Sequence, residues 1–382
     1  MSTPDVQTFT GWAATAPNTP LQSYEYDPGP LGAEDVEVAV EFCGICHSDQ
    51  SMIDNEWGRT RYPFIPGHEV VGKVVRVGDQ VRGLKLGQRV GIGWNKGSCM
   101  HCASCMEGSH QLCRTVQPTI IGGNGGFADR LRAHWAWAIP IPDAIEPSLA
   151  GPLFCAGSTV FSPLVELDIK PTDRVGVVGI GGLGHLALRF LNAWGCEVTA
   201  FTSSPSKQDE AKRLGAHHAV ASNDSAAIKA IAGTLDFLLV TASADLDWAS
   251  LMTTLRGRGR LHFVGIVPSA IPVHVFSLIP AQKAISGSPV GSPSNMAKML
   301  EFCARHQIVP QRGVAGARGQ VDVGRRDAAP GHPPAGRDRG ARSRVAVQRG
   351  QRAHVACGKD AAVCRVRRLE GGERLALVAG RL

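Results

Sequence analysis

The 382-residue chain lacks any uninterrupted apolar run close to the roughly 18 residues that a membrane-spanning helix needs, so we expect no spanning segment. Its first residues contain neither the basic nor the apolar stretch of a secretion signal, and we therefore expect a cytoplasmic protein. With 43% hydrophobic and 19% charged residues, the composition excludes collagen-like and disordered chains. The sequence has no internal repeat, and its length predicts two or three domains.

Aromatic side chains are missing from residues 311–382, although the chain has 7 Trp, 3 Tyr and 12 Phe. This segment carries 16 basic and 6 acidic residues, a net +10, so residues 1–310 carry −3 of the overall +7. Three interpretations are a basic nucleic-acid-binding tail, a disordered extension and a segment translated in the wrong reading frame. The basic character therefore belongs to the tail and not to the rest of the chain.

Residues 1–150 have the pattern of a β-rich domain. Residues 36–42 and 70–77 include stretches in which apolar and polar side chains alternate, as in strands with one buried face. Frequent glycines between residues 67 and 91 supply turns. We predict a small, strongly bent β-domain.

From about residue 173 the pattern changes to strands that alternate with helices. Predicted strands cover residues 174–179, 197–201, 235–240, 260–264 and 284–286, and predicted helices cover 183–194 and 205–214. This alternation is typical of a parallel sheet covered by helices on both faces. The fold class is therefore α/β, with a β-rich domain preceding a doubly wound one.

Four cysteines with short spacings predict a structural zinc site. Cys99, Cys102, Cys105 and Cys113 follow the pattern C-x2-C-x2-C-x7-C. Four thiolates complete a tetrahedral zinc shell without an open position. Disulfides are disfavoured in a cytosolic chain, and the spacing does not match common iron–sulfur motifs.

A second, dispersed set of ligands predicts a catalytic metal. Cys46, His68 and Cys155 would give zinc two thiolates and one imidazole, with one position left open. Asp49 lies close enough to Cys46 in sequence to reach His68 and orient its ring. Cys43 competes with Cys46 as a ligand, and the spacing alone does not decide between them.

A glycine-rich turn predicts a dinucleotide site. The sequence Gly179-Ile-Gly181-Gly182-Leu183-Gly184 follows a predicted strand and opens a predicted helix. Glycines permit the tight turn and a close backbone approach, and the helix N-terminus accepts the pyrophosphate.

The end of the next strand indicates which nicotinamide cofactor is bound. An NAD enzyme carries an acidic residue there, but this chain has Ser203, Ser204 and Lys207, with no carboxylate before Asp209. Hydroxyl groups and a cation suit a 2′-phosphate, which favours NADP(H) over NAD(H). The alternative is a solvated loop that does not discriminate between the two.

Together these motifs resemble the zinc-dependent medium-chain alcohol dehydrogenases, in particular the cinnamyl-alcohol-dehydrogenase-like group and its bacterial NADPH-dependent aldehyde reductases. The resemblance runs from about residue 10 to Pro310. Besides the cysteine lobe and the glycine-rich turn, the segments that carry it are Cys-Gly-Ile-Cys-His-Ser-Asp (43–49), Asn-Glu-Trp-Gly (55–58), Tyr-Pro-Phe-Ile-Pro-Gly-His-Glu (62–69), Gly-Gly-Phe-Ala (125–128) and Leu-Phe-Cys-Ala-Gly (153–157).

The resemblance implies roles for individual residues. It favours Cys46 over Cys43 as a ligand of the catalytic zinc and makes Glu69 an alternative ligand. Ser48 would pass a proton between the zinc-bound oxygen and the cofactor ribose. His47 would contact the cofactor phosphates. Ser51 stands where many relatives have the histidine that ends the proton relay. Trp57 and Trp94 would line an apolar substrate pocket.

The resemblance also implies domain boundaries. A GroES-like catalytic domain would span residues 1–156 with its zinc lobe at about 95–115, and a Rossmann NADP-binding domain would span 157–293. Residues 294–310 would return toward the catalytic domain. Because the match stops where the chain becomes rich in Arg and Gly, we favour a frame error as the origin of residues 311–382.

The predicted activity is the reversible reduction of aldehydes to primary alcohols with NADPH, using two zinc ions per chain. An NAD-dependent alcohol dehydrogenase of the same fold is one alternative, and a non-catalytic protein that binds zinc and nucleotide is another. We expect a homodimer that acts on small molecules and has neither a nucleic-acid nor a membrane partner.

Overall fold

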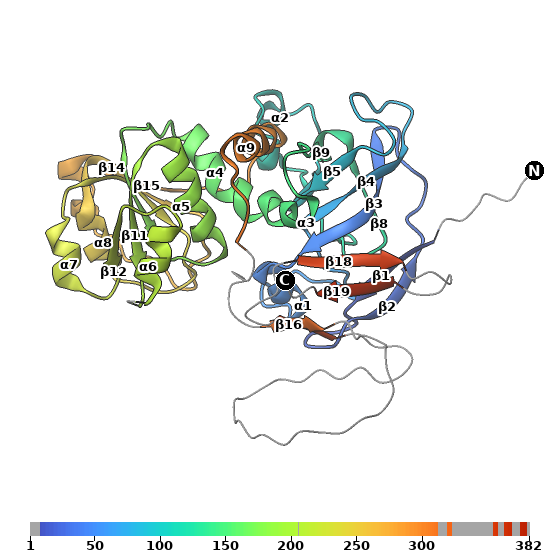
Figure 1. The fold of residues 1–382 in the computed structure, drawn as a ribbon, viewed down its shortest axis with the longest axis horizontal. Coiled ribbons are helices and arrows are strands. Elements are labelled where there is room, and N and C mark those ends of the chain that lie inside the picture. The colour runs from blue at the N-terminus through green and yellow to red at the C-terminus, as the bar shows by residue number, and fades with distance from the viewer. Residues whose placement is uncertain are drawn as a thin grey trace, which may run out of the picture. The chain divides into compact units, whose positions relative to one another are not determined.

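The computed structural model describes residues 8–204 and 206–311, and beyond them the backbone of four strands (Figure 1). Contacts divide the chain into two units. The described part of the first unit comprises residues 8–96, 117–138 and the strands beyond 318, and that of the second comprises 97–116 and 139–311.

The first unit is built around β3 (Asp35–Gly44), the longest of its described strands. β3 pairs antiparallel with β4 (Val70–Val77), with β8 (Arg130–His134) and with β18 (Val363–Arg368). The remaining strands of this unit are β1 (Phe9–Ala13), β2 (Gln22–Tyr26), β5 (Arg89–Ile92), β6 (Asn95–Gly97), β7 (Gln117–Pro118), β16 (Gly319–Asp322), β17 (His354–Cys357) and β19 (Leu375–Ala379). The expectation of a bent β-domain is confirmed.

Alternating side chains give this sheet its buried face. Val36, Val38 and Val40 of β3 are at most 7% exposed and pack in one core cluster with Val70 and Val74 of β4. The register of β3 on β4 shifts twice, at irregularities that bend the sheet. The end of β3 leads directly to α1 (His47–Ile53), which Cys46 immediately precedes.

The second unit contains a six-stranded parallel sheet with the strand order β12-β11-β10-β13-β14-β15. Its strands are β10 (Arg174–Val178), β11 (Glu197–Thr202), β12 (His218–Ala221), β13 (Leu235–Val240), β14 (Leu255–Phe263) and β15 (Ala284–Gly287). The helices between them are α5 (Gly182–Trp194), α6 (Ser206–Arg213), α7 (Ser225–Ala230) and α8 (Trp248–Thr254). The predicted doubly wound architecture is confirmed.

The order of this sheet places the glycine-rich turn. The chain moves from β10 outward to β12 and returns to β13 on the opposite side of β10. In open sheets of this kind, ligands bind at the carboxyl ends of the strands where the order reverses. The turn after β10 lies at that point.

Two longer helices and several short elements complete the second unit. They are α2 (Ala103–Met106), η1 (His110–Leu112), β9 (Ile139–Pro140), α3 (Pro147–Ala150), η3 (Gly151–Phe154), α4 (Ala156–Glu166), η4 (Val275–Ser277), η5 (Ile279–Ala281) and α9 (Pro293–His306). Another 3-10 turn, η2 (Trp135–Trp137), belongs to the first unit. A chain of ring contacts packs α4, α5 and α9 together through Phe161, Phe190 and Phe302.

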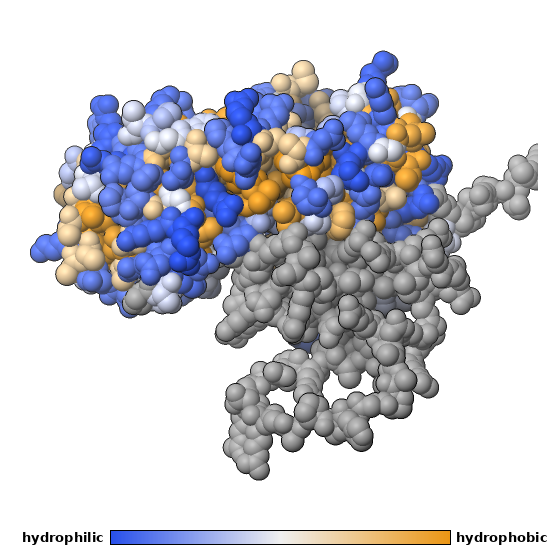
Figure 2. Space-filling view, in the orientation of Figure 1, coloured by the Kyte–Doolittle hydropathy of each residue, from blue (hydrophilic) through white to orange (hydrophobic). Residues whose placement is uncertain are grey.

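The described residues contain no single helix with the length and apolar composition to cross a membrane. A pair of helices, Pro147–Phe154 and Ala156–Glu166, meets that test only jointly and is bent by 56°. Figure 2 shows hydrophilic residues over much of the visible described surface, with hydrophobic residues between them.

Most of the unusual C-terminal segment lies outside the described residues, so a frame error or a disordered extension remains a prediction. Within it, β18 and β19 pair antiparallel, and β18 extends the sheet beside residues 42–44 of β3. β16 and β17 form a separate pair. The predicted domain boundaries at 156, 293 and 310 likewise remain predictions.

Candidate active site

The first unit brings Cys46, His68 and Glu69 together. One ligand atom from each lies within 4.8 Å of the others. Cys46 precedes α1, whereas His68 and Glu69 precede β4, so the pairing of β3 with β4 joins the two segments. His68 is fully buried and Glu69 is 3% exposed.

Asp49 holds these two segments in place with a buried carboxylate. Its Oδ1 lies 2.8 Å from His68 Nδ1 and accepts a hydrogen bond from the backbone N–H of Gly67 at 2.9 Å. Its Oδ2 accepts the N–H of Cys46 at 3.0 Å. Because Asp49 occupies Nδ1, Nε2 of His68 is the ring nitrogen available to a metal.

The charge of Asp49 also controls the His68 ring. Burial acts to lower the pKa of the imidazole, but the nearby Asp49 carboxylate outweighs it and holds that pKa well above its usual value. A metal at Nε2 would replace the proton that this environment otherwise favours. The donor set, a thiol, an imidazole and a carboxylate in a buried space, fits zinc.

Two glycines leave room for this arrangement. A β-carbon at Gly44 would lie 1.9 Å from Glu69 Oε2. Gly67 has a φ of +101°, and a β-carbon there would lie 2.9 Å from Cys43 Sγ. Cys43 is buried against Gly67 and is not among the clustered ligand atoms, so the geometry favours Cys46, as the resemblance did.

The other predicted residues of the first unit lie close to this centre in sequence or in space. The Trp94 and His68 rings pack edge to face with 4.9 Å between centroids, and the Trp57 and Trp94 rings do so at 6.1 Å. His47 is exposed and Ser48 is half-buried in the first turn of α1. Cys155 belongs to the second unit, where it immediately precedes α4.

Ser51 has a partner that the sequence did not indicate. Its buried hydroxyl donates to Glu56 Oε2 at 2.6 Å. The contact depends on a turn after α1 in which Asn55 adopts a φ of +56°. No spacing rule pairs a helical serine with a carboxylate five residues later, so only the Asn-Glu sequence of a turn could have hinted at it.

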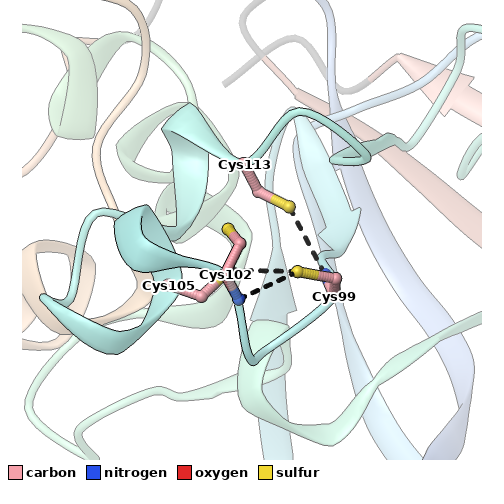
Figure 3. A group of neighbouring side chains, drawn as sticks. All are labelled: Cys99, Cys102, Cys105 and Cys113. Carbon is pink, nitrogen blue, oxygen red and sulfur yellow. Dashed lines mark hydrogen bonds between the residues drawn. The ribbon is translucent and has the colours of Figure 1, made fainter.

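The four cysteines of the lobe converge in the second unit (Figure 3). Their sulfur atoms lie within 4.8 Å of one another, and Cys99 Sγ is 3.9 Å from Cys105 Sγ. A tetrahedral zinc with metal–sulfur bonds of about 2.3 Å requires sulfur atoms about 3.8 Å apart. The cluster therefore fits a zinc ion.

The lobe stabilises thiolates unequally. Burial raises the pKa of the Cys105 thiol to about 11. Burial acts in the same direction on Cys113, but hydrogen bonds from the Cys99 N–H and from Thr115 lower its pKa to about 6. Bound metal would deprotonate the remaining thiols, because a ligating thiol gives up its proton.

The glycine-rich turn has the geometry of a phosphate cradle. Gly179 adopts a φ of +89°, and a β-carbon on Gly184 would lie 2.0 Å from the Gly179 carbonyl oxygen. Gly181 immediately precedes α5 and has open space where its β-carbon would be. The backbone at this 13-residue helix therefore leaves room for a pyrophosphate, and the cofactor site stays a prediction.

The residues predicted to select the cofactor follow β11. Ser203 is exposed, and Ser204 Oγ lies 3.2 Å from Ser206 Oγ at the start of α6. Lys207 is exposed, and its backbone N–H donates to the Ser204 carbonyl. Of the predicted cofactor residues, Gly182 and Leu183 lie in the first turn of α5.

Comparisons with known proteins agree with this geometry. The alcohol dehydrogenase GroES-like domain matches residues 32–143, and the zinc-binding dehydrogenase domain matches residues 182–305. The chain is 52% identical over 299 residues to the aldehyde reductase AdhA of Synechocystis, an alignment that covers 78% of this chain and 89% of that protein.

Solved structures of related proteins share the fold. A cinnamyl alcohol dehydrogenase from Sorghum bicolor is 38% identical with a TM-score of 0.76, covering 79% of this chain and 89% of that one. The cinnamyl alcohol dehydrogenase of Helicobacter pylori in complex with NADP(H) is 29% identical with a TM-score of 0.73, covering 80% and 90%. This chain therefore belongs to the zinc-dependent medium-chain alcohol dehydrogenases, the family of the aldehyde reductases and cinnamyl alcohol dehydrogenases.

Proposed function

We propose that this protein reduces aldehydes reversibly to primary alcohols with NADPH. The observation that carries the proposal is the buried Asp49 carboxylate, which joins Cys46 and the His68 ring beside Glu69. The 52% identity to an aldehyde reductase supports an aldehyde as the substrate.

Cys155 is proposed as the third ligand of the catalytic zinc. It is the cysteine of Leu-Phe-Cys-Ala-Gly (153–157), one of the segments that resemble the family. Its side chain is half-buried, and the residue immediately precedes α4. When bound, zinc polarises the carbonyl oxygen and stabilises the negative charge that develops there, and NADPH supplies the hydride. Asp49 fixes the orientation of His68, and Glu69 is proposed as an alternative ligand.

The remaining residues of the centre are proposed to position substrate and protons. Trp57 and Trp94 provide an apolar wall beside His68 that excludes water. Ser48, in the first turn of α1, is proposed to hand a proton to the substrate oxygen, and the exposed His47 is proposed to contact cofactor phosphates. Ser51 with its Glu56 partner stands at the position where the relay would end.

The four-cysteine cluster is proposed to hold a second, structural zinc. Its sulfur spacing matches a closed tetrahedral site, which has no position for substrate. A zinc ion there would hold together the lobe of α2 and η1.

NADPH is proposed over NADH because of the residues after β11. Ser203, Ser204 and Lys207 offer hydroxyl groups and a cation, and no carboxylate precedes Asp209. Rates measured with NADPH and NADH at equal concentration test this preference. Lys207→Gln should lower the preference for NADPH, mainly through KM, whereas Lys212→Gln at the far end of α6 should not; an equal rate with both cofactors would favour the NAD-dependent alternative.

A homodimer is proposed from the edge of the parallel sheet. β15 ends the sheet in the described part of the chain and has neither proline nor charge to protect its edge. Exposed apolar side chains occur on β15 and in the segment that leads to it in the chain, namely Ile266, Val275, Phe276, Ile279 and Ile285. A second copy would cover them by pairing the same edge across a two-fold axis, and the molar mass in solution tests this. A cytoplasmic location stays a prediction.

Product analysis tests the proposed reaction against its non-catalytic alternative. Zinc-loaded protein supplied with NADPH and benzaldehyde should form benzyl alcohol in the same molar amount as NADP. A protein that binds NADPH but forms no alcohol from any aldehyde is instead a binder of zinc and nucleotide.

A further inference from the structure

The first unit has a pocket that is lined in part by the four residues after Trp57. It is lined by the consecutive residues Gly58, Arg59, Thr60 and Arg61, together with Ile121 and Gly122. Its volume is about 480 Å³, which suits a substituent of a small molecule. We call it the arginine pocket.

The loop that carries both arginines is held in place by its neighbours. Thr60 donates its backbone N–H to Asn55 Oδ1 at 3.0 Å and its hydroxyl to the Met52 carbonyl at 2.5 Å. Tyr62 donates its hydroxyl to the Ile53 carbonyl at 2.6 Å. These bonds tie the loop to the end of α1, so the pocket is preorganised.

Both guanidinium groups are available to an anion. Arg59 and Arg61 are exposed, and neither makes an ion pair or a side-chain hydrogen bond with another described residue. The carboxylates of Asp54 and Glu56 on the same loop already accept hydrogen bonds from the neutral side chains of Gln50 and Ser51. Guanidinium groups pair with oxyanions through two parallel hydrogen bonds.

A row of aromatic rings runs from the candidate metal centre to Trp57, the residue that precedes the pocket loop in the chain. His68 contacts Trp94 with 4.9 Å between centroids, Trp94 contacts Trp57 with 6.1 Å, and Trp57 precedes the pocket loop. A molecule lying along these rings would have one end at His68 and the other near Arg59 and Arg61. Its middle would be apolar, because it lies against indole rings.

We propose that the arginine pocket binds an oxyanion at the far end of the substrate, so that the preferred substrates are aldehydes with an apolar or aromatic middle and a terminal carboxylate or phosphate. This inference rests on the proposed function, since it names the substrate class of the same site. Two arginines on one wall, with no described acidic partner, would otherwise be an unfavourable lining for an apolar aldehyde.

The first test compares 4-carboxybenzaldehyde with its methyl ester, which is uncharged and one methyl group larger. The wild-type protein should favour the acid by about fivefold or more in kcat/KM, through KM, which corresponds to about 1 kcal/mol. Arg59→Gln and Arg61→Gln should each lower this ratio, and the double variant should bring it to about one. Raising the salt concentration should lower the wild-type ratio as well.

Arg82→Gln is the matched control, because Arg82 is an exposed arginine of the same unit that does not line the pocket. It should retain the wild-type ratio. A wild-type ratio near one, or a double variant that keeps the preference for the acid, would overturn the proposal.

The second test uses binding and does not depend on turnover. The affinities of 4-(hydroxymethyl)benzoate and its methyl ester are measured by calorimetry for the wild type and the double arginine variant. Tighter binding of the acid that is lost in the variant supports the pocket even if no aldehyde is reduced, in which case only the proposed reaction fails. Equal binding of both compounds by the wild type would overturn the pocket as an anion site.

Discussion

Asp49 is the residue on which the candidate metal centre depends most. Its carboxylate contacts Cys46, Gly67 and His68 at once and is 1% exposed. Asp49→Asn would replace one acceptor oxygen with a donor amide and remove the negative charge. We expect the affinity for the catalytic zinc to fall by about 10- to 100-fold, with loss of turnover.

Zinc content after dialysis against a chelator measures this effect. Asp54→Asn, at the end of the same helix, is the control and should keep the zinc. Unchanged zinc retention in Asp49→Asn would show that Asp49 does not support the metal.

At the scale of single residues, the sequence predicted one contact of the metal centre and left one choice of ligand open. The Asp49–His68 contact followed from its distance to Cys46 along the chain, and the geometry bears it out. The spacing left Cys43 and Cys46 equivalent, because either could precede a turn of helix. The resemblance favoured Cys46, and in the structure the pairing of β3 with β4 places Cys43 against Gly67, outside the clustered ligand atoms.

Arg59 and Arg61 were not singled out from the sequence. Two arginines separated by one residue in a loop are ordinarily interpreted as charged side chains in solvent. Nothing in their spacing indicates a pocket. Their role depends on Ile121 and Gly122, which lie some 60 residues away in the chain.

At the scale of elements, the lobe of four cysteines is expected to depend on bound zinc for its stability. α2 has four residues and η1 three, too few to hold a fold without other support. Cys102→Ser should remove one zinc per chain and lower the midpoint of thermal unfolding. Cys46→Ser should abolish turnover with a smaller effect on that midpoint, and equal unfolding midpoints for the two variants would contradict the separate roles of the two sites.

His262 makes the stability of the parallel sheet sensitive to acid. Its ring lies 2.9 Å from the hydroxyls of both Ser286 and Ser288, joining β14 to the edge strand and the residue after it. Burial, with a smaller effect of Arg260, lowers its pKa to about 4. Between pH about 6.5 and about 4 the unfolded chain binds a proton here that the folded chain does not, so acid favours unfolding.

We therefore expect the unfolding midpoint to fall on going from pH about 7.5 to about 5.5, and to fall less in His262→Gln. His306→Gln, an exposed position on α9, should keep the wild-type fall. An equal fall in the wild type and in His262→Gln would refute this origin of the acid sensitivity.

Among the elements, those with a clear period were predicted best. The strand at 235–240 and the one at 70–77 have the predicted bounds. β14 begins at Leu255, five residues before its predicted start, because Gly257 and Gly259 concealed it. α4 was not predicted, since Pro163 lies inside the helix and its apolar residues run nearly all round it.

At the scale of the whole molecule, the overall charge of +7 is the sum of two parts with opposite signs. Residues 1–310 carry −3, and the segment after them carries +10. The family domain matches end at residue 305, just before this change of composition. The division agrees with a frame error after the family-like part.

The coding DNA around codon 311 provides the test. If the segment arose by a frame error, an adjacent frame should encode aromatic residues and a strand-like ending in place of residues 311–382. The absence of such a sequence in both other frames would contradict the frame error and leave the basic segment as a genuine feature.

The central claim is that this chain reduces aldehydes with NADPH at a zinc held by Cys46 and His68. Its most direct test is the rate of NADPH oxidation by zinc-loaded wild-type protein, with and without an aldehyde, beside Cys46→Ser at the same concentration. The account predicts aldehyde-dependent oxidation by the wild type and none by the variant. No oxidation with any aldehyde, or the same rate in Cys46→Ser, would contradict it.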